Sequence, residues 1–100
     1  MSYARPNTLT VTVSGNTGTG TINLPAISGV RLRVISIDAP AAASYDWVVR
    51  DSDGYAMTGE TGASGDETYY MDIPAKNSIV FTFVNASNGT YSIRVWDEYL

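Results

Sequence analysis

The chain has 100 residues and a formal net charge of −4 at pH 7, and its hydrophobic content of 44% is too high for an intrinsically disordered protein. One hydrophobic core fits a chain of this length, so residues 1–100 are expected to form a single domain. Six basic residues spread along the chain make no stripe for nucleic acid, and no apolar run approaches the roughly 20 residues of a membrane-spanning helix. Cysteine and histidine are absent, which excludes disulfides, thiolate zinc sites and the usual catalytic base.

The first clear strand signal covers residues 7–14, in which threonine alternates with leucine and valine. A period of two places the apolar side chains on one buried face and the threonines on a wet face. A second strand is predicted over residues 19–24, between the turn sequence at residues 15–18 and Pro25.

Residues 30–38 predict a longer strand whose alternation changes phase. Leu32 and Val34 lie opposite the arginines of this strand, but Ile35 and Ile37 fall on the arginine side. Two interpretations remain open. A β-bulge near residues 34–36 turns both isoleucines inward, or the far end of the strand has an apolar outer face and the isoleucines belong to a protein interface.

The middle of the chain predicts a strand over residues 45–50, a turn at residues 51–54 and a short returning strand over residues 55–58. Residues 59–66 contain three glycines and no apolar side chain larger than alanine. This composition predicts a mobile surface loop.

The strongest strand signal lies near the C-terminus, after a predicted strand over residues 68–73. Two runs rich in β-branched and aromatic residues, 78–84 and 90–96, flank the five-residue loop 85–89. This arrangement predicts a β-hairpin whose inner faces form the floor of the core.

The outer face of the predicted hairpin is partly apolar, through Val80, Val84 and Trp96. A strand that is apolar on both faces is either covered within the domain or meets another subunit. We therefore expect the partner surface on this face.

These signals add up to an all-β fold, an antiparallel β-sandwich or jelly roll of about eight short strands. Short tails at residues 1–6 and 97–100 are expected outside the strands, and tails of this kind commonly become ordered against a partner. The candidate contacts in the tails are Tyr3, Arg5, Tyr99 and Leu100.

Exposed aromatic rings are further candidates for binding. Trp47 is in phase with Val49 and is predicted to lie in the core, whereas Tyr55, Tyr70 and Trp96 are candidates for exposure. Such rings cover a sheet face, contact another protein or stack on sugar rings, and the sequence leaves all three interpretations open. The interface candidates outside the tails are Ile35, Ile37, Tyr70, Val80, Val84 and Trp96.

No motif predicts catalysis, a cofactor or a metal. Asp51 and Asp53 resemble the start of a calcium loop, but the third ligand and the distal glutamate are missing, and an Asp-Gly turn explains the same residues. A domain of this size seldom holds a cleft for a pair of catalytic carboxylates. We therefore predict a protein that is not an enzyme.

Two segments follow a known pattern: residues 45–54, Tyr-Asp-Trp-Val-Val-Arg-Asp-Ser-Asp-Gly, and residues 89–95, Gly-Thr-Tyr-Ser-Ile-Arg-Val. In order and spacing they resemble the β-sandwich of bacterial pre-peptidase C-terminal domains. The resemblance covers about half of the chain and implies a non-catalytic accessory module. It keeps open an alternative function as a carbohydrate-binding or cell-surface module.

As a cysteine-free, threonine- and glycine-rich sandwich of this size, the chain also resembles the small capsid decoration (cement) proteins of tailed bacteriophages. This similarity is one of type. It implies a virion structural protein that binds the outside of the assembled capsid and stabilises it, often as a homotrimer. The implied partners are the major capsid protein or other virion proteins, with no nucleic acid and no membrane.

The N-terminal sequence lacks the basic segment and the apolar core of a signal peptide. Together with the resemblance to decoration proteins, this predicts synthesis in the host cytoplasm and localisation in the virion.

Overall fold

The computed structural model describes residues 3–24, 30–75 and 77–99, with the backbone alone for residues 3–5 and 99. Its secondary structure consists of eight antiparallel strands, which confirms the predicted all-β class. No helix suited to crossing a membrane occurs in these ranges. The strands are β1 (Tyr3–Val13), β2 (Gly18–Asn23), β3 (Val30–Asp38), β4 (Ser44–Arg50), β5 (Ala56–Ser64), β6 (Glu67–Pro74), β7 (Ser78–Val84) and β8 (Gly89–Tyr99).

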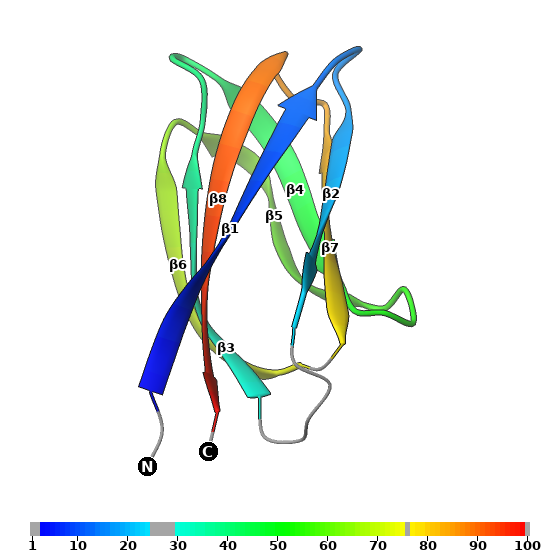
Figure 1. Ribbon diagram of the computed structural model, residues 1–100. Coiled ribbons are helices and arrows are strands. Elements are labelled where there is room, and N and C mark those ends of the chain that lie inside the picture. Colours follow the sequence, from blue (N-terminus) through cyan, green and yellow to red (C-terminus); the bar gives the residue numbers. More distant parts are fainter. Residues whose placement is uncertain (1–2, 25–29, 76, 100) are drawn as a thin grey trace.

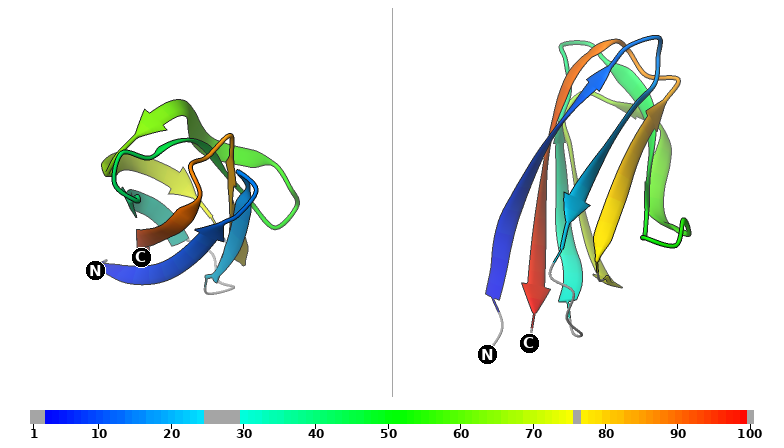
Figure 2. Two further views of the ribbon diagram at one scale, coloured as in Figure 1. Left: turned by 90° about the horizontal axis from the view of Figure 1, so that it is seen from above. Right: turned by 45° about the vertical axis from the view of Figure 1, so that its right-hand side comes forward.

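The strands form two four-stranded sheets that pack face to face as a sandwich. One sheet has the order β1-β8-β3-β6 and the other has the order β2-β7-β4-β5 (Figure 1). Seen from above, the two sheets curve around a shared core (Figure 2). Most connections along the chain cross from one sheet to the other, and only β4 and β5 are consecutive neighbours in one sheet among the eight strands. This strand order is that of a jelly roll.

The predicted hairpin over residues 78–96 is wrong. β7 pairs with β2 and β4, whereas β8 pairs with β1 and β3, so residues 85–88 carry the chain from one sheet to the other. The predicted inner faces are nevertheless buried, because each arm places its apolar side in the core from its own sheet. The rings of Phe83 and Tyr91 meet across the sandwich with their centroids 4.8 Å apart.

The phase change in β3 comes from a β-bulge, as the first interpretation predicted, although the register shifts just before the predicted range. The register of β3 shifts between Leu32 and Val34 against both of its neighbours, β6 and β8. Beyond the shift, Ile35 and Ile37 point inward and are 0% exposed. Their assignment as interface residues is therefore wrong, and Val34 takes the partly exposed outer position instead.

The two predicted tails are largely strand. β1 begins at Tyr3 and β8 ends at Tyr99, and these two residues are register partners at the ends of the β1–β8 ladder. The pairing needs no apolar alternation, because the backbone supplies its hydrogen bonds. Pro6 fits this ladder because β1 is the edge strand of its sheet.

Asp97, near the C-terminal end of β8, is part of the interior of the sandwich. This carboxylate is buried, and Nδ2 of Asn7 in β1 donates a hydrogen bond to its Oδ1 at 2.8 Å. The tail candidates Tyr3, Arg5 and Tyr99 have side chains outside the described part of the structure, and Leu100 lies outside it altogether.

The predicted mobile loop over residues 59–66 is also wrong. β5 continues to Ser64 and pairs with β4, which leaves only a tight turn before β6. Gly62 takes a positive φ of 72° within the strand, and its N–H donates to Oδ1 of Asp46 at 2.8 Å. The glycines therefore allow irregularities in a paired strand instead of forming a loop.

Aromatic side chains from both sheets build the centre of the core. Trp47 is 3% exposed, which confirms its predicted place, and its ring stacks on Phe81 with a centroid distance of 6.2 Å. Tyr45 packs edge-on against Tyr91 at 5.3 Å, and its hydroxyl donates to the carbonyl of Gly65 at 2.8 Å. The core thus joins β4, β7 and β8 across the two sheets.

Replacement of Phe81 by alanine should lower the free energy of unfolding by about 3–5 kcal/mol, because it removes a fully buried ring and leaves a cavity. Urea denaturation monitored by circular dichroism measures this loss. Val84→Ala, on the outer face of the same strand, is the matched control and should cost no more than about 1 kcal/mol. Equal losses for the two variants would contradict the assignment of inner and outer faces.

Alkaline pH should weaken the fold through Tyr45. Burial of the phenol raises the pKa of Tyr45 above its usual range, so the folded state keeps a proton that the unfolded state releases above a pKa of about 10. This contribution to the free energy of unfolding is complete below about pH 9 and is lost as the pH rises above about 10. Urea midpoints measured from about pH 8 to about pH 11 should therefore fall steeply at the upper end.

Tyr45→Phe is the test of that cause. The variant should lose less stability across the same pH range, although some dependence remains because burial also raises the pKa of Tyr69 to about 12. An identical alkaline fall in the wild type and the variant would show that Tyr45 is not responsible.

Candidate functional site

The topology distributes the predicted surface residues over two outer faces. Tyr70 and Trp96 lie on the outer face of the β1-β8-β3-β6 sheet, whereas Val80 and Val84 lie on the outer face of the β2-β7-β4-β5 sheet. The expectation that Val80, Val84 and Trp96 share one face is wrong, because β7 and β8 belong to different sheets. Each outer face therefore has to be considered as a separate site.

Four side chains form a row across the first of these faces, and we call them the aromatic row: Pro6, Trp96, Val34 and Tyr70. The register places them at one level, with Trp96 opposite Pro6 on one side and opposite Val34 on the other, and Val34 opposite Tyr70. Tyr70 is 81% exposed, and Trp96 and Val34 are partly exposed. The row crosses all four strands of the sheet.

A shallow hollow lies along this row. It has a volume of about 340 Å³ and is lined by Val34, Ser36, Thr68, Tyr70 and Trp96. Ser36 and Thr68 are register partners on β3 and β6, and their hydroxyl oxygens are 3.4 Å apart. The hollow therefore combines two aromatic rings with a pair of hydroxyl groups.

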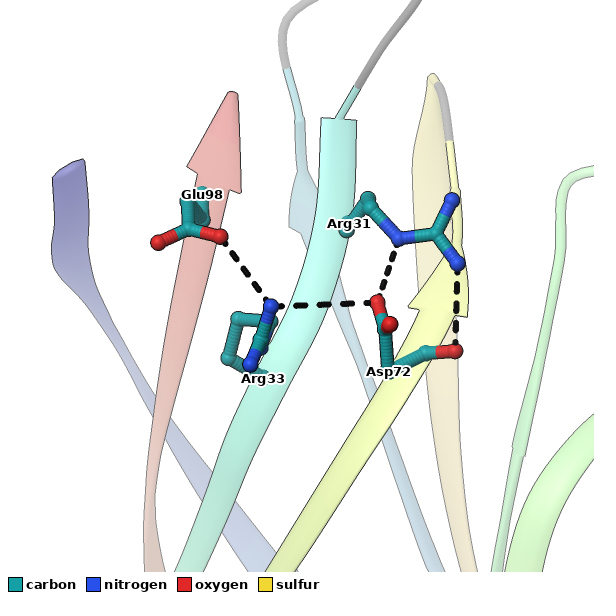
Figure 3. Close-up of polar contacts among 4 residues, drawn as sticks. All are labelled: Arg31, Arg33, Asp72 and Glu98. Carbon is teal, nitrogen blue, oxygen red and sulfur yellow. Dashed lines mark hydrogen bonds and ion pairs between the residues drawn. The ribbon is translucent and has the colours of Figure 1, made fainter. Parts of the chain in front are cut away.

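Ion pairs lie beside one side of the aromatic row. Nε of Arg31 donates a hydrogen bond to Oδ1 of Asp72, and Nη1 of Arg33 lies 3.1 Å from Oε1 of Glu98 and 3.9 Å from Oδ1 of Asp72 (Figure 3). These four residues come from three adjacent strands, β8, β3 and β6. The hydrogen bond from Arg31 is the main reason why the pKa of Asp72 is lowered, so its carboxylate stays charged at neutral pH.

A further ion pair lies on the other side of the row. Nη2 of Arg94 is 3.3 Å from Oδ2 of Asp38, and the guanidinium carbon lies 5.8 Å from the ring centroid of Trp96. A cation at this distance from an indole is attracted by the electrons of the ring. Arg94 therefore helps to hold Trp96 in place, while Asp38 holds Arg94. Arg31, Arg33 and Arg94 on this outer face therefore all pair with carboxylates of the same chain.

The second outer face carries valine and threonine side chains, and we call Val48, Val80, Thr82 and Val84 the valine face. The register places Thr82 opposite Val48 in the middle of the sheet, with Thr19 of β2 on the other side of Thr82. Val84 is 40% exposed, and the other members are partly exposed.

Charged residues lie at the two ends of the valine face on β4. Asp46 is opposite Val84, and Arg50 is opposite Val80. The Asp46 carboxylate accepts hydrogen bonds from Nδ2 of Asn85 at 3.0 Å and from a backbone N–H of β5, and these bonds lower its pKa. The centre of the face is thus uncharged, and one of its two flanking charges is already engaged in hydrogen bonds.

The turn interpretation of residues 51–54 is confirmed. Oδ1 of Asp51 accepts hydrogen bonds from the N–H groups of Asp53 and Tyr55, both at 2.9 Å, and Gly54 has a positive φ of 88°. Across the ranges that the structure describes, no three acidic side chains gather in a way that could hold a metal ion. Tyr55 is 74% exposed beside this turn, which projects from the sandwich in Figure 1, and it is not part of the aromatic row.

Sequence reasoning identified Tyr70 and Trp96 but missed Val34, which completes the row between them. A strand without a bulge would bury Val34, and that is where simple alternation placed it. The change of alternation in residues 30–38 could have indicated the position of Val34, because a strand that turns Ile35 inward turns the preceding side chain outward.

Comparisons with known proteins find likeness only at the level of solved structures. No protein-family model matches the chain, and no curated protein matches it. The chain is similar to the crystal structure of FLHE, with 16% identity and a TM-score of 0.48 over 98% of this chain and 96% of that chain. It is similar to the VP2 subviral particle of infectious bursal disease virus, with 12% identity and a TM-score of 0.44, over 100% of this chain and 32% of that chain. Tailspike protein 4 of bacteriophage CBA120 matches with 12% identity and a TM-score of 0.40, over 94% of this chain and 17% of that chain.

Proposed function

We propose that this chain is a non-enzymatic structural protein of a bacteriophage virion, a capsid decoration protein that binds the outside of the assembled capsid and stabilises it. The observation that carries the proposal is the valine face. An interface core between proteins is depleted in charge and surrounded by a polar rim, and the valine face has this arrangement on a regular sheet.

The size of the valine face bears on how it would bind. The sheet that carries the valine face has four strands. With a strand spacing of about 4.8 Å and a strand length of about six residues, the whole outer face of this sheet measures roughly 400 Å², and the valine face is only part of it. A stable interface buries about 800 Å² per partner, so one such face binds weakly by itself. We therefore propose that the chain acts as a homo-oligomer whose copies contact more than one capsid subunit.

Stabilisation then follows from mass action. A protein that binds the assembled lattice and not its separate subunits shifts the equilibrium toward the lattice. Linked copies bind with an effective concentration that exceeds the concentration in solution, so weak faces together give firm attachment. This function requires no catalytic group, cofactor or metal, and it places the protein in the virion.

A second candidate function is a carbohydrate-binding or cell-surface module. The specific observation that favours it is the aromatic row, which brings the exposed ring of Tyr70 and the partly exposed ring of Trp96 to one face. The valine face and the aromatic row lie on opposite sides of the sandwich, so the two functions are compatible.

Replacement of Val80 and Val84 by lysine should lower binding to the capsid by at least about tenfold, because each lysine brings a charge that would be buried at the interface. The assay mixes purified variants with particles that lack the chain, from the virus that encodes it, and measures the protein that sediments with the particles. Thr10→Lys adds a charge to the opposite outer face and is the matched control. Urea midpoints of the variants establish that all of them are folded.

Two results would overturn the proposal. The first is full occupancy of the particles by the double lysine variant. The second is absence of the chain from purified virions when their proteins are identified by mass spectrometry.

A further inference from the structure

The two rings of the aromatic row are separated by a distance that a sugar chain matches. Trp96 on β8 and Tyr70 on β6 lie on either side of β3, and Val34 of β3 lies between them. Two strand spacings amount to about 10 Å. This is close to the length of one disaccharide unit in an extended β-linked chain, so two sugar rings of one such chain can each meet one aromatic ring.

The chemistry of the hollow also suits a pyranose. A pyranose ring has an apolar face of C–H groups and a rim of hydroxyl groups, and the electron-rich face of an aromatic ring attracts such C–H groups. Val34 supplies a lower apolar floor between the two rings, and the hydroxyls of Ser36 and Thr68 line the same hollow. Sites for small ligands usually have this composition, with a mostly apolar surface and a few polar groups.

The charge of this surface selects among sugar chains. Three arginines flank the row, and each of them is paired with a carboxylate of the same chain. The surroundings of the row are therefore nearly neutral, while the whole chain carries a net charge of −4. An anionic polysaccharide would be repelled by the chain as a whole, whereas a neutral one loses nothing. The flanking pairs are Arg31 with Asp72, Arg33 with Glu98, and Arg94 with Asp38.

Contacts within the chain favour the position of the Trp96 ring before any ligand arrives. Arg94 lies over this ring and is itself held by Asp38. A side chain that is already fixed loses little conformational freedom on binding, which raises affinity for a given contact.

We infer that the aromatic row and its hollow form a binding site for neutral, linear, β-linked glycans, with Trp96 and Tyr70 stacking on two sugar rings. The inference rests on the second candidate function and deepens it by naming the class of glycan, and it is independent of the proposed attachment to a capsid, which concerns the opposite outer face. A decoration protein with this site would present it to glycans outside the particle.

Binding is measured by calorimetry and by tryptophan fluorescence with neutral β-1,4-linked oligomers of glucose and of N-acetylglucosamine, from one to six units long. We expect the hexamer of at least one series to bind with a dissociation constant below about 1 mM. Oligomers of three or more units should bind at least about tenfold more tightly than the monosaccharide, because only they reach both rings. The fluorescence change should come from Trp96, since Trp47 is buried.

Tyr70→Ala and Trp96→Ala should each weaken binding of the hexamer by about tenfold, which is the loss expected for one stacked ring. Tyr55→Ala removes an equally exposed ring from the β4–β5 turn and should leave binding unchanged. If Trp96→Ala does not fold, Tyr70→Ala still tests the site, because the Tyr70 side chain is 81% exposed.

Several results would overturn the inference. They are no binding of any neutral hexamer, equal binding by the wild type and the Tyr70→Ala variant, or tighter binding of the acidic polymer polygalacturonate. Self-association of the wild type that Tyr70→Ala abolishes, measured by sedimentation, would assign the row to a contact between copies instead. Sedimentation of Tyr70→Ala with virus particles distinguishes failure of this inference from failure of the capsid proposal, since the valine face is intact in this variant.

Discussion

The β-bulge between Leu32 and Val34 sets both the core and one outer face of this sandwich. Below the bulge, β3 buries Val30 and Leu32, and above it the same strand buries Ile35 and Ile37. Regular alternation would send both isoleucines to the solvent, at a cost of about 1.5–3 kcal/mol for each side chain. The same shift brings Val34 out between two aromatic rings, so one irregularity in the backbone produces the floor of the candidate glycan site.

Because the chain crosses repeatedly from one sheet to the other, the domain has two outer faces with different chemistry. Because β7 and β8 separate after residue 84, the apolar outer residues of β7 gather with those of β4, and Trp96 of β8 gathers with Tyr70 of β6. A hairpin would have merged these residues into one apolar patch. The jelly roll instead yields a valine face with an uncharged centre and an aromatic row between ion pairs.

The ion pairs beside the aromatic row matter more for the charge and the side-chain positions at the candidate site than for the free energy of folding. Exposed pairs such as Arg94 with Asp38 contribute little free energy of folding, about 0–1 kcal/mol each. Their main effect here is to cancel charge around the row, and the pair with Asp38 also favours the position of Arg94 over Trp96. An unpaired arginine at the same place would favour anionic ligands, so the carboxylate partners determine the selectivity that we infer.

The sequence by itself determined the strand class, the number of strands and most of the buried faces. Period-two alternation identifies the inner side of a strand wherever the strand pairs. This is why the inner faces predicted for residues 78–84 and 90–96 are buried, with Ile79, Phe81 and Tyr91 among their residues. Only the tertiary structure decided which strands are neighbours, because a backbone ladder forms equally well with any partner of suitable length. As a result, the segments predicted to form a hairpin over residues 78–96 belong to different sheets, and the predicted loop over residues 59–66 is largely part of β5. The choice of neighbours also brought Trp96, Val34 and Tyr70 into one row, since residues far apart in the sequence share a level only through the register of the sheet.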